Sequence, residues 1–315
     1  MQKPLIRYLP DFIDYCEVEK GLSVKTQENY TRFLQKFFKW LKENHLSDLQ
    51  PKDLSEEQVW KYRIFLSRFV DPVKQRLLKK TTQNYYLIAL RSLLSFFVEK
   101  NITSLPPEKI KLAKDKAERE IKFLQLDQLK RLLEAPDNVT AIGRRDRAIL
   151  ETLFSTGLRV SELARLSLSD LRLRPDVDDL EITVIGKGEK VRTIYFSTRA
   201  VKAIRSYLEL RGDLDPALFI NFKRAKLLSD ASRRLTVKSV EDIVSKYVRI
   251  SGLAVKATPH TLRHSFATDL LAQGVDLRLV QEFLGHRNLS TTQIYTHVTN
   301  KQLRDIHRKV HNGRL

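Results

Sequence analysis

The chain has 315 residues, enough for two modest domains, and its 42% hydrophobic and 30% charged residues are typical of a globular protein rather than a disordered or membrane-embedded one. Lys and Arg number 57 against 38 Asp and Glu, which gives a formal net charge of +19. Such an excess favours a polyanionic partner such as nucleic acid over the alternative that the charge serves solubility alone.

The start of the chain and its single cysteine indicate the cellular location. The chain reaches Pro10 and Asp11 before any long apolar stretch forms, so we expect no signal peptide, and no stretch approaches the length of a membrane span. Cys16 has no partner for an intrachain disulfide, and it lies among apolar residues where a buried thiol would pack. We therefore expect a cytoplasmic, nucleoid-associated protein.

Residues 5–100 predict four helices and no strand. Apolar residues recur there at helical spacing, as in the two series Tyr30, Leu34, Phe37, Phe38, Leu41 and Val59, Tyr62, Phe65, Leu66. The segment from Ser55 to Gln58 has the form of a capping box, and Thr81 or Thr82 is the expected start of the last helix. Residues 1–105 are thus predicted to form a small helical domain.

Residues 106–120 are predicted to link this domain to a second one. The segment from Ser104 to Glu120 reads SLPPEKIKLAKDKAERE, with two prolines, abundant charge and few large apolar side chains. This composition suits an extended, exposed linker, and a solvated helix over 108–120 is the alternative. The second domain then covers residues 121–315.

The second domain is predicted to be mainly α with a small antiparallel sheet. Helical patterns occur in five stretches, at 125–134, 144–155, 198–211, 237–250 and from 259 onward. Between them, LEITVI and VRTIYF flank the turn GKGEK, which predicts a single β-hairpin.

The first candidate site residue, Arg159, follows a glycine that can end a helix. Gly157 suits a helix C-terminus, so Arg159 stands at the head of the next helical segment, with Glu162 three residues on. A guanidinium at a helix N-terminus can bind a phosphate bidentately, and Glu162 can orient it. The alternative is a surface arginine paired with Glu162.

Lys187 lies between two glycines in the predicted hairpin turn. Gly186 and Gly188 allow a sharp bend that projects one ammonium group away from the sheet. Such a lysine can donate a proton to a leaving oxygen. Exposed turn lysines are common, however, and an ordinary surface role is the alternative.

The stretch ATPHTLRHSFATDLL predicts an anion-binding helix start. Thr258 can cap the helix, Pro259 suits its first position, and His260 and Arg263 then share one face. An imidazole and a guanidinium at the positive end of a helix suit a phosphate, with His260 able to exchange a proton near neutral pH. We expect His264 to face elsewhere. A capped helix with incidental polar residues is the alternative.

The last two candidates follow a glycine-ended helix. His286 comes directly after Gly285, and Tyr295 lies nine positions later in a short segment behind a turn. A tyrosine in such a segment can serve as a nucleophile. It can equally be a half-buried packing residue beside Ile294.

Taken together and in this order, these residues closely resemble the catalytic signature of tyrosine recombinases, also called phage-type integrases, and in particular the Xer-like subgroup. The resemblance spans nearly the whole chain and is strongest where PHTLRHSFATDLL, LGH and STTQIYTHV recur with family-like spacing. It implies a SAM-like core-binding domain followed by a mixed, mostly α catalytic domain. The segment LRLRPDVDDL departs from the shorter family pattern.

The resemblance also implies roles for the candidate residues. Arg159 and Arg263 match the phosphate clamps, Lys187 the proton donor, His260 and His286 the phosphate ligands and proton-transfer groups, Tyr295 the nucleophile, and Glu162 an acidic supporting position. A tyrosine nucleophile stores the cleaved bond as a 3′-phosphotyrosine, so we expect neither ATP, a metal nor any other cofactor.

The expected activity is site-specific DNA recombination, of the Xer-like kind that resolves chromosome or plasmid dimers during chromosome partition and cell division. The alternatives are integration of a mobile element, topoisomerase-like nicking and resealing, and an inactive architectural DNA-binding protein. Lys25 and Arg91 are candidates for DNA contact in the first domain.

The expected partners are double-stranded DNA and further recombinase subunits. The resemblance implies a tetramer on two DNA sites, formed by this chain alone or with a related recombinase, and a DNA translocase is a further candidate. Residues 300–311 carry Leu303, Ile306 and Val310 at helical spacing, and in this family such a helix docks on the neighbouring subunit. Docking on its own domain is the alternative.

Overall fold

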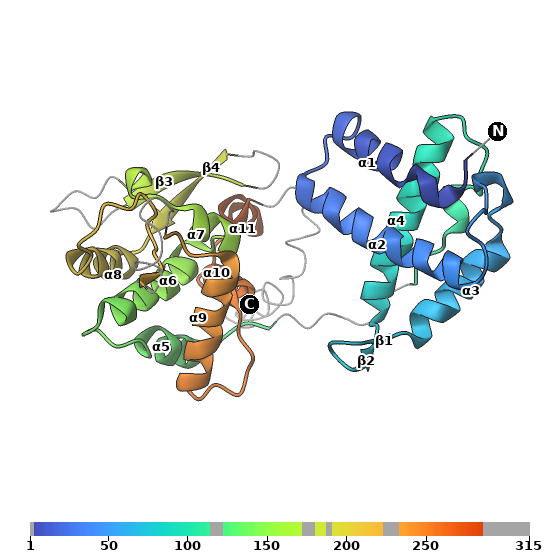
Figure 1. The fold of residues 1–315 in the computed structure, drawn as a ribbon. Helices are drawn as coiled ribbons and strands as arrows, with labels where there is room; N and C mark the ends of the chain where they lie inside the picture. Colours follow the sequence, from blue (N-terminus) through green and yellow to red (C-terminus); the bar gives the residue numbers. More distant parts are fainter. Residues whose placement is uncertain (1–2, 114–121, 172–179, 187–190, 223–232, 286–315) are drawn as a thin grey trace, which may run out of the picture. The chain divides into compact units, whose positions relative to one another are not determined.

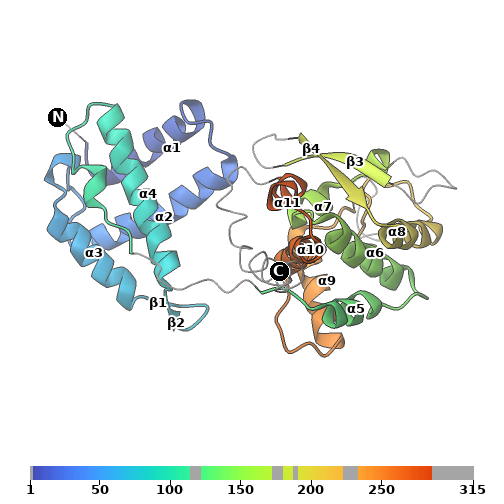
Figure 2. The same ribbon diagram turned by 180° about the vertical axis from the view of Figure 1, so that it is seen from behind.

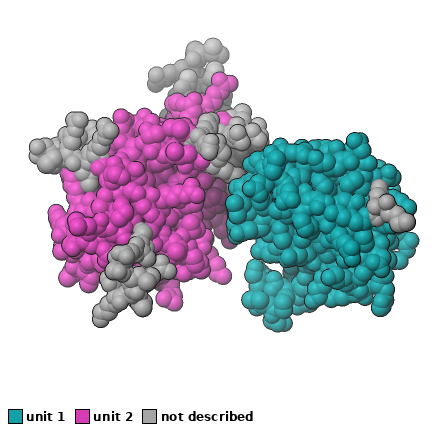
Figure 3. Space-filling model, turned by 45° about the horizontal axis from the view of Figure 1, so that its top comes forward, with its two compact units in different colours: residues 1–118 teal, residues 119–315 magenta. Residues whose placement is uncertain are grey.

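The computed structural model describes residues 3–113, 122–171, 180–186, 191–222 and 233–285 (Figure 1). The chain divides into two compact units, residues Met1–Glu118 and Arg119–Leu315, which Figure 3 colours separately. None of the helices in the described ranges is both long and apolar enough to cross a membrane.

The first unit is the predicted four-helix domain. Its helices are α1 (Leu9–Val18), α2 (Val24–Glu43), α3 (Glu56–Arg68) and α4 (Lys80–Glu99), with short 3-10 turns at Leu5–Tyr8, Pro51–Asp53 and Pro107–Lys109. Phe12, Phe37, Tyr62 and Phe97 are among its largest fully buried side chains, and Cys16 is buried beside them as expected. An aromatic core of this kind buries enough area to stabilise a small unit.

Two helix starts were predicted in this unit, and one is correct. Ser55 caps α3 through a capping box with Gln58, as its sequence predicts. Neither Thr81 nor Thr82 caps α4, because the helix begins at Lys80 and both threonines lie in its first turn.

Two short features of the first unit were not predicted. A two-residue strand pair, β1 (Val70–Asp71) and β2 (Arg76–Leu77), closes the loop before α4. The segment expected to be an exposed linker begins inside the core of this unit, because Pro107 and Ile110 are buried there. The apolar content of 104–113 is low, but the turn at Pro107–Lys109 packs against α4 and Ile110 joins the apolar core.

The second unit is mostly helical with one antiparallel hairpin, as predicted. Its helices are α5 (Leu126–Glu134), α6 (Ala141–Thr156), α7 (Val160–Arg165), α8 (Thr198–Glu209), α9 (Val237–Ile250), α10 (Pro259–Ala272) and α11 (Leu277–Leu284), with a 3-10 turn at Leu168–Asp170. The hairpin strands β3 (Leu180–Ile185) and β4 (Val191–Phe196) coincide with the two predicted runs, and Val184 pairs with Arg192.

Helix α6 lies at the centre of the second unit. It contacts α8 on one side and α10 on the other, and Figure 2 shows it between them. Ile149, Leu150 and Leu153 are completely buried in this helix. Because α6 is held on several sides, its C-terminal end gives the functional side chains a rigid base.

Candidate active site

Arg159 is fixed by Glu162 at the junction of α6 and α7. Gly157 ends α6 in the left-handed conformation, with φ of +59°, and the chain turns there into α7. The backbone N–H of Arg159 donates to Glu162 Oε2 at 2.8 Å, and Arg159 Nη1 donates to Glu162 Oε1 at 2.9 Å. The predicted pair therefore exists, but Glu162 is buried, so it is not an ordinary surface ion pair.

Arg263 is buried at the start of α10. Thr258 caps this helix and Pro259 is its first residue, as predicted. Nη1 of Arg263 donates to the carbonyl oxygen of Gly157 at 2.5 Å, and Nη2 donates to that of Leu284 at 2.6 Å. One guanidinium thus joins the C-terminal ends of α6 and α11.

Three arginines bind three consecutive carbonyl oxygens at the end of α11. Arg192 Nε donates to Phe283 at 3.2 Å, Arg263 Nη2 to Leu284 at 2.6 Å, and Arg159 Nη2 to Gly285 at 3.3 Å. The last carbonyls of a helix have no partner within the helix and lie at its negative end, so they favour guanidinium donors. Side chains from α10, β4 and the α6–α7 junction are thereby brought to the residue that precedes His286.

His260 lies in the first turn of α10 near the two predicted clamps. Desolvation by the surrounding protein lowers the pKa of His260, and the positive charges of Arg263 and Arg159 lower it further. The imidazole is therefore neutral at neutral pH, which leaves one ring nitrogen as acceptor and the other as donor.

His264 does not face away from His260, contrary to our expectation. The two ring centroids are 5.4 Å apart with an interplanar angle of 58°, because residues four apart share a helix face. Burial, followed by the charges of His260 and Arg263, lowers the pKa of His264 to about 4. His264 therefore remains neutral over the ordinary pH range.

Arg192 is a member of the site that sequence reasoning missed. Its Nη1 and Nη2 donate to Glu162 Oε1 and Oε2 at 3.0 and 2.8 Å, and both side chains are less than 10% exposed. Burial raises the pKa of Glu162, but hydrogen bonds from Arg192 and Arg159 outweigh it and lower the pKa to about 2. The signal was present in the sequence, because alternation along β4 places Arg192 on the same face as buried Ile194 and Phe196.

The remaining predicted residues lie elsewhere in the chain. Lys187, His286 and Tyr295 fall outside the described residues, the first directly after Gly186 and the second directly after Gly285. Lys25 and Arg91 are exposed on α2 and α4 of the first unit, and Lys25 pairs with Glu28. Across the ranges that the structure describes, no group of His, Cys, Asp and Glu side chains is arranged to hold a metal ion.

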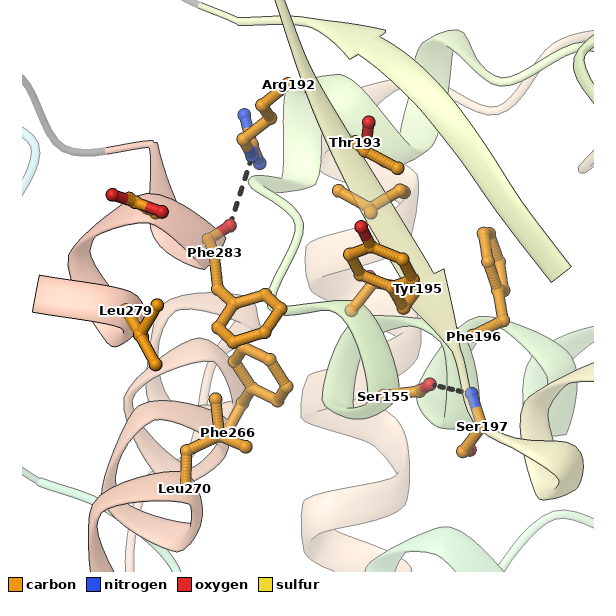
Figure 4. A pocket seen from close by; sticks show the side chains of 13 residues that line it. Ser155, Arg192, Thr193, Tyr195, Phe196, Ser197, Phe266, Leu270, Leu279 and Phe283 are labelled. Carbon is orange, nitrogen blue, oxygen red and sulfur yellow. Dashed lines mark hydrogen bonds between the residues drawn. The ribbon is translucent and has the colours of Figure 1, made fainter. Parts of the chain in front are cut away.

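An apolar groove lies beside the arginines, between β4, α10 and α11. It has a volume of about 740 Å³. Figure 4 shows its main side chains, which are Tyr195, Phe266, Leu270, Leu279 and Phe283. The rings of Tyr195 and Phe283 meet edge to face, with centroids 6.0 Å apart. Open apolar grooves of this kind typically receive another apolar surface.

The comparisons with known proteins agree with the fold. Residues 122–302 match the phage integrase family, and residues 9–101 match the N-terminal SAM-like domain of phage integrases. A tyrosine recombinase XerC from Pelotomaculum thermopropionicum is 37% identical over 96% of this chain and 97% of its own length. A tyrosine recombinase XerD from Listeria innocua is 36% identical over 96% and 98%.

A solved structure supports the fold. The XerH site-specific recombinase bound to palindromic difH substrate, in a post-cleavage complex, covers 97% of this chain and 98% of its own with a TM-score of 0.73 and 24% identity. The family model covers more than half of the chain, and both curated relatives exceed 30% identity over nearly its full length. The chain belongs to the phage integrase family and is a Xer-like tyrosine recombinase, an enzyme that transfers DNA strands.

Proposed function

We propose that the chain recombines DNA at specific sites by cleaving each strand with Tyr295. The phenolic oxygen attacks the scissile phosphorus, the bond from phosphorus to the 5′ oxygen breaks, and a 3′-phosphotyrosine forms. Rejoining reverses the step, because a 5′-hydroxyl from the partner strand attacks the phosphotyrosine and the tyrosine leaves. The observation that carries the proposal is that Arg159 and Arg263 bind the carbonyl oxygens of Gly285 and Leu284, directly before the segment with Tyr295. His260 lies close enough to both arginines for their charges to lower its pKa.

The two arginines supply the charge that such a reaction needs. Attack on a phosphodiester places additional negative charge on the non-bridging oxygens, and preorganised guanidinium groups stabilise it. Arg263 is buried and Arg159 is held by Glu162, so both cations are oriented before DNA binds. This orientation reduces the reorganisation required during the reaction.

Proton transfer falls to the lysine and the histidines. Lys187 protonates the leaving 5′ oxygen. In the sequence this lysine lies between strands β3 and β4. Neutral His260 hydrogen-bonds the phosphate or accepts the phenolic proton, and His286 is a second phosphate ligand. Lys25 and Arg91 contribute phosphate contacts from the first unit.

We propose further that the active form is a tetramer on two duplex DNA sites. Residues 300–311 of one subunit dock into the apolar groove of its neighbour, with Leu303, Ile306 and Val310 against Phe266, Leu279 and Phe283. The groove is open and apolar, and a helix with one apolar stripe fits it. A cyclic exchange of this helix closes the ring of subunits.

The biological role proposed for this activity is resolution of chromosome or plasmid dimers. Relatives named XerC and XerD match the chain almost equally, at 37% and 36% identity over nearly its full length. This similarity favours a Xer-type role over integration of a mobile element. We propose that the enzyme works on the nucleoid, with a related recombinase and a DNA translocase as partners.

A nicked suicide substrate tests the proposed nucleophile. Cleavage beside a nick releases a short oligonucleotide, so rejoining is prevented and the covalent complex accumulates. We expect a complex with the wild type and with Tyr195→Phe, and none with Tyr295→Phe. Sequencing the DNA attached to the protein in cells then identifies the target site. A covalent complex with Tyr295→Phe contradicts the proposal.

A further inference from the structure

Arg192 makes contacts that join three elements of the described site. Its guanidinium binds both carboxylate oxygens of Glu162, and its Nε binds the carbonyl oxygen of Phe283, the contact drawn as a dashed line in Figure 4. Glu162 in turn holds Arg159 by its side chain and its backbone N–H. Three elements, α7, β4 and α11, therefore meet at this one side chain.

We infer that Arg192 is a positioning residue for strand cleavage, which holds Glu162 and Arg159 on one side and the end of α11 on the other. The inference rests on the proposed function. Arg192 touches no reacting atom in this scheme. It acts through Arg159, which clamps the phosphate, and through α11, whose last carbonyls precede the segment that carries His286 and Tyr295.

Two cations share the buried carboxylate of Glu162. The carboxylate is buried, and a buried carboxylate is stable only when its oxygens are hydrogen-bonded and its charge is compensated. With Arg192 present, Arg159 needs to supply only one of its donors to Glu162 Oε1. Without Arg192, the guanidinium of Arg159 is drawn further toward Glu162 and away from the place of a phosphate.

The shape of arginine is required as well as its charge. The planar fork of Arg192 reaches Glu162 with two nitrogens while its third nitrogen faces Phe283, and a lysine ammonium cannot make this set of contacts. A Cβ atom on Gly285 would lie 2.9 Å from Cδ of Arg192, so the backbone of α11 also approaches the side chain closely. We therefore expect position 192 to require arginine and position 285 to require glycine.

The test separates positioning from simple charge compensation. The Arg192→Met variant leaves Glu162 without its main partner, so its stability falls. The Arg192→Met, Glu162→Gln double variant removes the charge and recovers stability, because a neutral amide is less costly to bury than an unpaired carboxylate. Each protein is measured by single-turnover cleavage of the suicide substrate at saturating DNA, by DNA affinity and by thermal unfolding.

The comparison that decides is the double variant against Glu162→Gln alone. We expect the double variant to cleave roughly 100-fold more slowly than Glu162→Gln, because α11 has lost the hydrogen bond from Arg192 to Phe283 and small misplacements of catalytic groups have effects of this size. DNA affinity should stay within about 3-fold, since most phosphate contacts do not involve Arg192. Equal cleavage by these two variants, both folded, overturns the inference.

Two further variants complete the design. Arg192→Lys keeps the charge and therefore the fold. We expect its cleavage rate to fall about 10-fold or more, because a single ammonium replaces the planar guanidinium. Cleavage by Arg192→Lys at the wild-type rate overturns the inference. Arg199→Met is the matched control, because Arg199 on α8 pairs with buried Glu151 on α6 and neither belongs to the site. It should lower stability and leave cleavage unchanged. Failure of the proposed function is distinguishable, because the wild type itself would then form no covalent complex.

Discussion

Arg159 donates a hydrogen bond to the backbone carbonyl of Gly285 at 3.3 Å, although the two residues are separated by most of the second unit's sequence. The neighbouring carbonyl, that of Leu284, is bound by Arg263. The end of α11 is therefore built into the same group of cations that the proposed chemistry needs. Helix α11 is itself anchored on α10 by Val280 and Leu284.

Arg263 is expected to support both stability and cleavage. Arg263→Lys loses at least one of the two carbonyl hydrogen bonds while keeping the charge, and hydrogen bonds to charged groups contribute about 1.5–3 kcal/mol each. We expect the free energy of unfolding to fall by about 2 kcal/mol, measured by urea denaturation. An unchanged unfolding free energy would show that the two carbonyls are not held by Arg263.

Gly157 should tolerate no side chain. An alanine there adopts a left-handed backbone, and its Cβ would lie 2.5 Å from Cδ1 of Phe266. We expect Gly157→Ala to destabilise by about 2–5 kcal/mol, the sum of backbone strain and overpacking. Gly252→Ala is the control, since Gly252 has a similar φ of +64° with nothing within 4 Å, and only the strain of about 1–2 kcal/mol applies. Equal losses of unfolding free energy in the two variants would contradict the predicted clash with Phe266.

Glu162 predicts a pH dependence with a defined sign. Its pKa is about 2 in the folded protein, below the ordinary value of 4.5, so the unfolded chain binds the proton more readily. The resulting stability is fully present above about pH 4.5 and is lost as the pH falls toward 2. Glu162→Gln should therefore show a shallower loss of unfolding free energy between these values. Identical slopes for the two proteins would contradict the assignment.

The apolar groove predicts a separation of assembly from cleavage. Leu279 is 50% exposed and lines the groove. Leu279→Ser should therefore leave the fold and half-site cleavage unchanged. It should weaken synapsis and strand exchange about 10-fold, which is the effect of losing one partly buried aliphatic contact. Leu214→Ser is the control, because Leu214 is fully exposed elsewhere on the unit. Deletion of 301–315 should have the stronger effect. Recombination at the wild-type rate by Leu279→Ser or by the deletion variant would argue against helix exchange.

Much of the local structure was predictable because it depends on short-range patterns. The alternation in LEITVI and VRTIYF correctly predicted both strands of the hairpin. Thr258 and Pro259 correctly predicted the start of α10. The helix start predicted at Thr81 or Thr82 was wrong, because α4 begins at Lys80. Lysine is a good helix former, and the helix starts there without a side-chain cap.

The contacts within the site were less predictable, because they join distant parts of the chain. Arg192 was missed, although the alternation of β4 marks it as an inward-facing residue. The carbonyls of Phe283 and Leu284 carry no side-chain signal at all, since every helix ends in such groups. Which arginine binds them is decided by tertiary packing, and a single sequence does not specify that.

The central claim is that Arg159 acts on the negative charge of one scissile phosphate, and a neutral phosphate tests it most directly. A methylphosphonate at the cleavage position replaces one charged oxygen with a methyl group. On the natural phosphodiester we expect Arg159→Ala to slow single-turnover cleavage by about 100-fold or more. On the methylphosphonate the same substitution should cost less than about 10-fold, since the charge that Arg159 stabilises is gone. An equal loss on both substrates would contradict the account.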